Sequence, residues 1–155
     1  MRGLRSDYLE NVARNFLKNF HGVMPCDWIG NFDPKVSDSV IINLSPSTDA
    51  GSHFVALHYD RKQNHFTYFD SFGMPCSNQY IIKYITSKKQ KSITFSAQQI
   101  QEFSSLFCGY YALSFLISRQ NDQNLSSFLS MFEKNELKKN EEICISYIKE
   151  MILNK

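Results

Sequence analysis

The chain has 155 residues, which suits one compact unit, and we expect residues 1–155 to form a single domain. Its hydrophobic content of 43% and charged content of 21% exclude wholesale disorder. The formal net charge of +2 is too small to indicate nucleic-acid binding by itself, and its lysine clusters are typical of solvated faces.

The four cysteines (Cys26, Cys76, Cys108 and Cys144) are scattered and form no C-x-x-C pair, which argues against a structural metal site. The first residues lack the apolar core of a signal peptide, and no apolar run reaches membrane-spanning length. We therefore expect a protein that is not secreted, contacts no membrane and keeps its thiols reduced when first made.

The first half of the chain predicts one helix and then a hairpin. A helix should run from Ser6 and Asp7 to the pair His21-Gly22, because apolar side chains recur with helical spacing up to Phe20. The apolar and aromatic segment 23–28 follows and carries Trp28, the only tryptophan. Strands are predicted at 40–44, 53–59 and 65–70, and the last two flank a polar loop as in an antiparallel hairpin.

The second half predicts more helix than strand. Helical spacing covers 77–85, and a β-branched strand covers 92–95. An apolar helix should begin at Cys108, and amphipathic helices should cover 125–132 and 140–153. This order predicts an α+β fold in which a small mixed or antiparallel sheet is packed by helices.

Cys108 stands at the start of the apolar helix, directly before Gly109. The free N–H groups and the positive dipole end of a helix N-terminus stabilise a thiolate, and the thiolate is the nucleophilic form of cysteine. The alternative is that Cys108 is a small core residue, since free cysteine is often buried.

His53 and Asp70 are predicted to meet, because His53 opens one hairpin strand and Asp70 closes the other. Asp70 could then fix the imidazole tautomer, and the second ring nitrogen could face the sulfur of Cys108. Each residue has a structural alternative. His58 or His65 could equally be singled out, and Asp70 could cap the turn at Phe72-Gly73.

Gln101 is the candidate for an oxyanion donor, because it lies on the polar segment that leads into the Cys108 helix. Acyl transfer to a thiolate passes through an oxyanion, which a side-chain amide N–H and a backbone N–H can stabilise together. Gln98 and Gln99 compete for this role, and any of the three could be solvated.

The order His53, Asp70, Gln101, Cys108 resembles that of the adenovirus-type (adenain-like) cysteine proteases and, more distantly, of the proteases that process ubiquitin-like modifiers. The matching segments are 51–57, 68–73 and 107–110, together with Gln101. The spacings within the two pairs resemble the adenovirus branch more closely. Segment 20–27 is similar to one in the proteases of Maverick/Polinton elements and related DNA viruses.

This resemblance implies a cysteine endopeptidase with Cys108 as nucleophile, His53 as general base and acid, Asp70 as its orienting partner and Gln101 as oxyanion donor. The implied substrates are viral structural-protein precursors such as capsid precursors, cleaved beside small residues during virion maturation. Candidates for substrate binding are Gly51, Ser52, Phe54 and Trp28. Many relatives carry Trp where this chain has Phe54, so the wall beside the imidazole should differ.

The resemblance also concerns cofactors and location. No cofactor is required by the sequence. Relatives are activated by a disulfide-linked peptide and by DNA. By this resemblance, Cys76 and Cys144 would be the candidate residues for the link to a peptide, and weak DNA binding would be expected. A monomer in the virion and the host-cell interior, including the nucleus, is expected. Two rivals stay open: a ubiquitin-like-modifier protease, and a catalytically silent binding module of the same fold.

Overall fold

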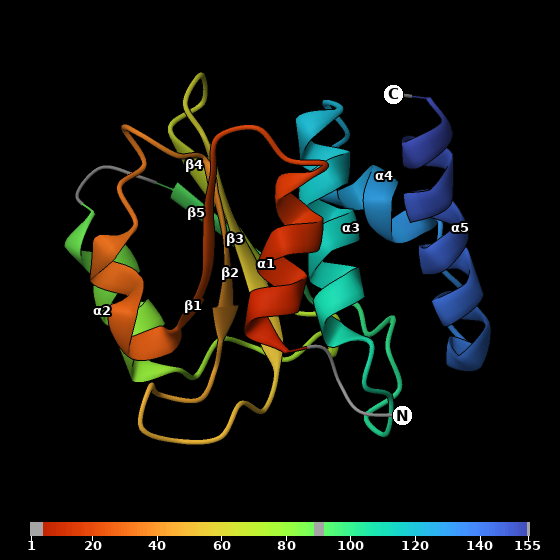
Figure 1. The fold of residues 1–155 in the computed structure, drawn as a ribbon, viewed down its shortest axis with the longest axis horizontal. Coiled ribbons are helices and arrows are strands. Elements are labelled where there is room, and N and C mark those ends of the chain that lie inside the picture. The colour runs from red at the N-terminus through yellow and green to blue at the C-terminus, as the bar shows by residue number, and fades with distance from the viewer. Residues whose placement is uncertain (1–4, 89–91, 155) are drawn as a thin grey trace.

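A computed structural model describes residues 5–88 and 92–154. One sheet has the strand order β1-β2-β3-β4-β5 (Figure 1). Its strands are β1 (Phe20–Pro25), β2 (Ser39–Asn43), β3 (Phe54–Asp60), β4 (His65–Phe69) and β5 (Ser92–Phe95). The inner pairs β2–β3 and β3–β4 are antiparallel, and the outer pairs β1–β2 and β4–β5 are parallel. The predicted α+β fold with a mixed sheet is confirmed.

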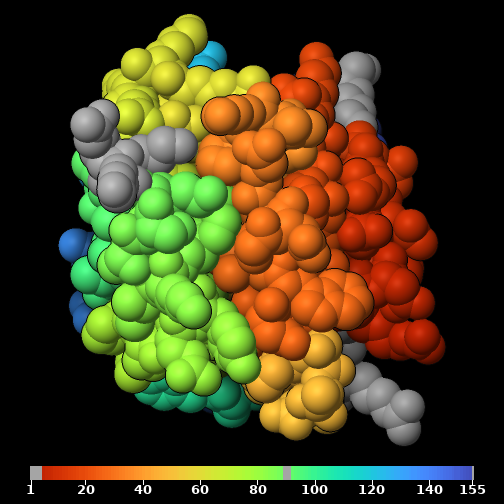
Figure 2. Space-filling model, turned by 90° about the vertical axis from the view of Figure 1, so that its left-hand side faces the viewer, coloured from red at the N-terminus to blue at the C-terminus, as the bar shows by residue number. Residues whose placement is uncertain are grey.

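Helices cover both faces of this sheet (Figure 1). One face carries α1 (Ser6–Arg14) and α3 (Cys108–Gln120), with α4 (Leu125–Ser130), η2 (Leu137–Lys139) and α5 (Asn140–Leu153) beyond α3. The other face carries the 3-10 helix η1 (Cys26–Asn31) and α2 (Gln79–Ser87), which adjoin on the surface in Figure 2. No helix in the described ranges combines the length and the apolar character that crossing a membrane requires.

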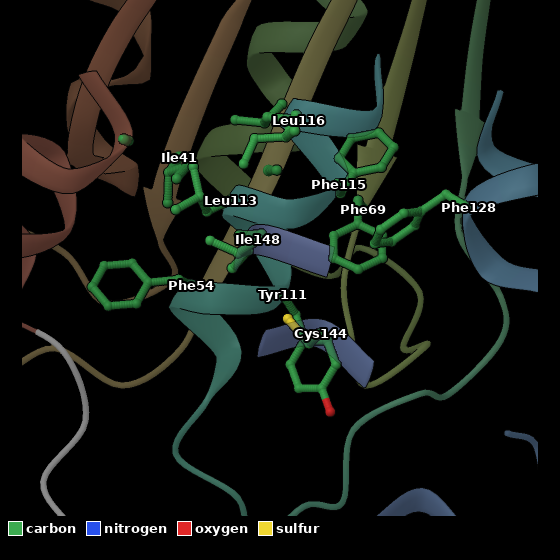
Figure 3. Packing of buried hydrophobic residues seen from close by; sticks show 14 of the residues in the cluster. Ile41, Phe54, Phe69, Tyr111, Leu113, Phe115, Leu116, Phe128, Cys144 and Ile148 are labelled. Carbon is green, nitrogen blue, oxygen red and sulfur yellow. The ribbon is translucent and has the colours of Figure 1, made fainter. Parts of the chain in front are cut away.

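The larger core lies between the sheet and α3 (Figure 3). Phe69 of β4 stacks on Phe115 of α3 with ring centroids 4.8 Å apart, and Phe128 meets Phe69 edge-on at 5.5 Å. Offset stacking and edge-to-face contacts suit the quadrupoles of aromatic rings. Cys144 and Ile148 of α5 close this core from the far side of α3. The buried helix predicted at Cys108 is therefore the central helix of the fold.

The smaller core lies under η1 and α2. Successive strand residues point to opposite faces, so Val55 and Leu57 of β3 enter this core while Ala56 enters the larger one. The two faces of β3 are both buried, which explains why its sequence is an apolar run without polar alternation.

The predicted N-terminal helix is wrong in its length. It ends at Arg14, and Phe20 begins strand β1, which runs parallel to β2. Asn19 turns the chain with a φ of 51°, and the amide of Gln120 binds the backbone of Phe16 and Lys18. Tertiary contacts thus override the helical spacing, although Phe20 is buried as its apolar character predicts.

Candidate active site

Cys108 is the first residue of α3, and its side chain is partly exposed. The helix places the sulfur beside Phe54, the first residue of β3. The backbone N–H of Phe54 points at Sγ over 3.5 Å. A thiol at this place has access to solvent, whereas the core cysteines Cys26 and Cys144 have none.

The hairpin brings His53 and Asp70 together, as their positions at the strand ends predict. Nε2 of His53 lies 2.7 Å from Oδ1 of Asp70, and both side chains are almost fully buried. Oδ1 of Asp70 also accepts the N–H of Phe72 over 2.9 Å, and the Asp70 N–H donates to Ser96. Asp70 therefore orients His53 and also caps the turn, so its two predicted roles coexist.

Charge controls the protonation of His53. Burial alone would lower the pKa of His53, but hydrogen bonds to Asp70 and Cys108 and the charges of both partners outweigh it and raise the pKa to about 9. The imidazole is consequently protonated at neutral pH. An imidazolium beside a cysteine favours the thiolate form of that cysteine.

Phe72 is a site residue that the sequence reasoning missed. Its ring stacks on the His53 imidazole with centroids 4.1 Å apart and planes 7° from parallel. The ring of Phe103 in turn packs against Phe72, with ring centroids 5.1 Å apart. The stack fixes the plane of the imidazole, a role that only the position of Phe72 two residues after Asp70 could have suggested.

Gln101 is fully buried against Ser71, the residue that follows Asp70. Its Oε1 accepts the hydroxyl proton of Ser71, and its Nε2 donates to the carbonyl of Ser105 over 3.0 Å. An amide nitrogen carries two protons, so one N–H of Nε2 has no partner among the described residues. The Ser71 carbonyl also accepts the N–H of Gln101, which fixes the residue against the turn that follows Asp70.

The side-chain amides of Gln98 and Gln99 make hydrogen bonds to other parts of the chain. Nε2 of Gln98 points at the carbonyl of Leu129 over 3.5 Å, and Nε2 of Gln99 donates to the carbonyl of Gln101 over 2.9 Å. The backbone of both residues packs closely against Gly73. A Cβ atom at position 73 would come within 2.7 Å of that backbone. Gly73 also has a φ of +67°, so this close approach and the turn both require glycine.

A cavity of about 830 Å³ opens in front of Cys108 and His53. The predicted binding residues Gly51, Ser52 and Phe54 line it. Trp28 does not, since it lies on η1 with 53% of its surface exposed. The remaining lining residues are Arg5, Ser6, Asp7, Asn43, Phe72, Phe103, Ser105 and Leu106.

Asn43 at the end of β2 shapes the loop before His53, and the sequence reasoning missed it. Its Oδ1 accepts the N–H groups of Ser45 and Ser52 over 2.8 and 3.3 Å. A Cβ atom on Gly51 would come within 2.5 Å of Nδ2 of Asn43. A side chain at position 51 would therefore require the Asn43 amide to shift from the loop before His53.

The other cysteines differ from Cys108. Cys26 and Cys144 are fully buried, and burial raises the pKa of the Cys144 thiol to about 12. Burial also raises the pKa of Cys76, which stays partly exposed. A peptide disulfide at Cys144 would require α5 to leave α3, whereas Cys76 is accessible for one. The described part of the chain contains no group of three His, Cys, Asp or Glu side chains able to hold a metal ion.

Comparisons with solved structures agree on the fold. An ASFV protease matches with a TM-score of 0.62 and 16% identity over 92% of this chain, which spans 66% of that protease. The SUMO protease Ulp1 matches with a TM-score of 0.55 and 13% identity over 96% of this chain and 78% of that one. ChlaDub1 from Chlamydia trachomatis matches with a TM-score of 0.53 and 14% identity over 76% of this chain and 60% of that one.

Sequence comparisons identify the family. A search of curated proteins gives no match. The sequence profile of the adenovirus endoprotease matches residues 20–152, which is most of the chain and includes His53, Asp70, Gln101 and Cys108. The chain belongs to the adenovirus endoprotease family of cysteine-type peptidases.

Proposed function

We propose that this protein is a cysteine endopeptidase in which Cys108, His53 and Asp70 act as a catalytic triad. The observation that carries this proposal is the bond of 2.7 Å between His53 and Asp70 in direct reach of the Cys108 sulfur. Asp70 binds Nε2 of His53, so Nδ1 is the nitrogen left for the sulfur.

The reaction would follow from these positions. The Cys108 thiolate attacks the carbonyl carbon of the scissile peptide bond, and the carbonyl oxygen becomes an oxyanion. The free N–H of Gln101 and the backbone N–H of Cys108 are the proposed donors to that oxyanion. His53 gives its proton to the leaving amine as the C–N bond breaks, which leaves a thioester on Cys108.

The second half regenerates the enzyme. A water molecule gives one proton to the now neutral His53 while its oxygen attacks the thioester carbonyl. The C–S bond then breaks, the carboxylic product leaves, and the Cys108 thiolate again faces a protonated His53. Asp70 keeps the imidazole oriented through both halves.

The proposed substrates are viral structural-protein precursors, such as capsid precursors, cleaved during virion maturation. Membership of the adenovirus endoprotease family supports this choice. A virion or host-cell location that includes the nucleus, an activating peptide and weak DNA binding belong to the same proposal. The chain would work as a single domain and a monomer, with Trp28 as an outlying substrate contact.

A ubiquitin-like-modifier protease is the second candidate, because the SUMO protease Ulp1 shares the fold. The aromatic side chains of Phe54, Phe72 and Phe103 in the cavity would suit an extended peptide tail of such a modifier. A catalytically silent module is the third reading, and it predicts no hydrolysis of either substrate.

The test compares the wild type, C108A and C76A on capsid-precursor peptides and on modifier–fluorophore conjugates, without an activating peptide and then with peptide and DNA. We expect cleavage of the precursor peptides and a loss of about 10⁴-fold or more in C108A, since the nucleophile is gone. In the arm without an activating peptide, C76A should match the wild type. Retained activity in C108A would refute the proposed nucleophile, and cleavage of modifier conjugates alone would favour the second candidate.

A further inference from the structure

The C-terminal helix α5 contacts the segment that carries the proposed oxyanion donor. Figure 1 shows the first turn of α5 at the same end of the molecule as the first turn of α3. Segment 100–107, the last part of the connection from β5 to α3, contains Gln101 and ends directly before Cys108. The first two residues of α5, Asn140 and Glu141, each bind this segment.

Glu141 binds it through Ser105. The hydroxyl of Ser105 donates to Oε1 of Glu141 and accepts the N–H of Phe107, the residue before Cys108, over 3.2 Å. The carbonyl of the same serine accepts Nε2 of Gln101 over 3.0 Å. Ser105 therefore connects Glu141 to both the proposed oxyanion donor and the residue preceding the nucleophile.

Asn140 binds the other end of the segment. Its Nδ2 donates to the carbonyl of Ile100 over 2.8 Å and to the carbonyl of Glu133 over 2.9 Å, while its Oδ1 accepts the N–H of Glu133. Asn140 is fully buried, and a buried amide with all of these bonds made holds its neighbours in one arrangement. Ile100 directly precedes Gln101, so the donor is held on both sides.

We propose that Glu141 and Asn140 are positioning residues that set the oxyanion donor Gln101 relative to Cys108, which makes the start of α5 part of the active-site scaffold. An oxyanion donor acts only when its N–H is held within hydrogen-bond distance of the developing charge. A small displacement of Gln101 would therefore slow acylation while leaving the thiol itself unchanged. The effect on catalysis rests on the proposed cysteine-protease function, whereas the clamp on segment 100–107 does not.

The test uses E141A, with E141Q and E142A as matched variants. Glutamine keeps an oxygen that can accept the Ser105 hydroxyl, and Glu142 is an exposed neighbour with the same charge at the same helix end. Asn140 is left intact because removing a buried amide that makes three hydrogen bonds would leave their backbone partners unsatisfied and would itself lower stability. The readouts are kcat and KM on a cleaved peptide, the rate of Cys108 alkylation by iodoacetamide, and hydrogen exchange of the amides in segment 100–107.

We expect E141A to lower kcat about tenfold with KM and the alkylation rate changed less than about twofold, because displacement of iodide forms no oxyanion. E141Q should recover kcat, and E142A should match the wild type. Amides of segment 100–107 should exchange faster in E141A than in E142A. Equal kcat in E141A and E142A, or an equal fall of kcat and alkylation rate in E141A, would overturn the inference.

If the wild type cleaves no peptide, the proposed function fails, and hydrogen exchange decides the clamp on its own. Faster exchange in E141A than in E142A then supports the positioning contact. Equal exchange in the two variants then overturns it.

Discussion

His53 and His58, two histidines of the same hairpin, have pKa values that are shifted in opposite directions. His53 lies just before β3 at the end of the sheet beside Cys108, and His58 lies near the other end of the same strand. Both are mostly buried, and burial acts against the protonated form of each. The pKa of His53 is nevertheless raised to about 9, whereas burial lowers the pKa of His58 to about 4.

Their partners explain the difference. His53 has Asp70 at 2.7 Å and the sulfur of Cys108 beside it. His58 has the positive charge of Arg119 nearby, which Asp60 opposes only in part, and its Nδ1 has no partner in the described part of the chain. It lies in a separate cavity of about 320 Å³ at the end of the sheet away from Cys108.

The comparison shows that burial does not make a histidine a catalyst. A carboxylate in contact is needed to hold the proton, and a thiol in contact is needed to use the charge. Only one end of the hairpin supplies both. Asp60, the last residue of β3, lies near His58 but makes no hydrogen bond to its ring.

The largest expected effect follows from the carboxylate. D70N keeps an oxygen for the Phe72 N–H but removes the charge that holds the proton on His53, so its pKa should fall. We expect peptide hydrolysis to drop about 10²-fold or more, because the imidazolium is no longer favoured. Steady-state kinetics would measure this.

The matched control is D60N, at the other end of the hairpin. It should change activity by less than about twofold, since Asp60 does not line the cavity in front of Cys108. Similar losses in D60N and D70N would show that the carboxylate acts through stability of the hairpin and not through His53.

The second effect is on stability at high pH. The pKa of His53 in the folded state, about 9, lies above its ordinary value of 6.5. The protonated ring therefore adds to the free energy of unfolding in full below about pH 6.5, and this contribution is lost as the pH rises through 9. From pH 7 to pH 9 the wild type should lose about 2 kcal/mol more of its free energy of unfolding than H53Q does. Urea unfolding at both pH values would show it, and equal losses would contradict the raised pKa.

The third effect has the opposite sign. The pKa of His58 in the folded state, about 4, lies below its ordinary value of 6.5. The contribution of the neutral ring to the free energy of unfolding is therefore present above about pH 6.5 and is lost as the pH falls through 4. Between pH 7 and pH 5 the wild type should lose about 1–2 kcal/mol more than H58Q. An unchanged pH slope in H58Q would mean that His58 gains a partner in solution.

The smallest effect concerns the stacked ring. F72A removes a contact worth about 0.5–1.5 kcal/mol to the orientation of His53, so kcat should fall about three- to tenfold. F95A, which truncates a half-exposed ring on the edge strand β5, is the control and should leave kcat unchanged. A fall in both variants would point to a general loss of packing.

The sequence alone predicted those parts of the fold and of the site that depend on residues close together in the chain. The polar loop between two apolar strands predicted the hairpin, and the hairpin alone predicted that His53 and Asp70 would meet. The apolar run after Cys108 predicted a buried helix with cysteine at its start. These features depend on residues close in sequence or on one antiparallel pairing.

The rest depended on contacts between distant segments. Phe20 fits a helical pattern as well as a strand, and only its pairing with β2 decides between them. The link between Ser105 and Glu141 is a hydrogen bond between distant segments, and the role of Asn43 comes from bonds to the backbone of the loop that follows it. A serine, an asparagine or a glutamate in a sequence gives no signal for either. Trp28 was favoured for its ring alone, and its place on η1 is set by packing.

The central claim is that His53 activates Cys108, and alkylation by iodoacetamide from about pH 4 to 9, with the modified cysteine identified by mass spectrometry, tests it most directly. We predict that Cys108 reacts well ahead of Cys26, Cys76 and Cys144 at about pH 5–6, because it is the partly exposed cysteine at a helix N-terminus in contact with the protonated His53. H53A should abolish that lead. Equal reactivity of Cys76 and Cys108, appearing only above neutral pH and unchanged in H53A, would contradict the account.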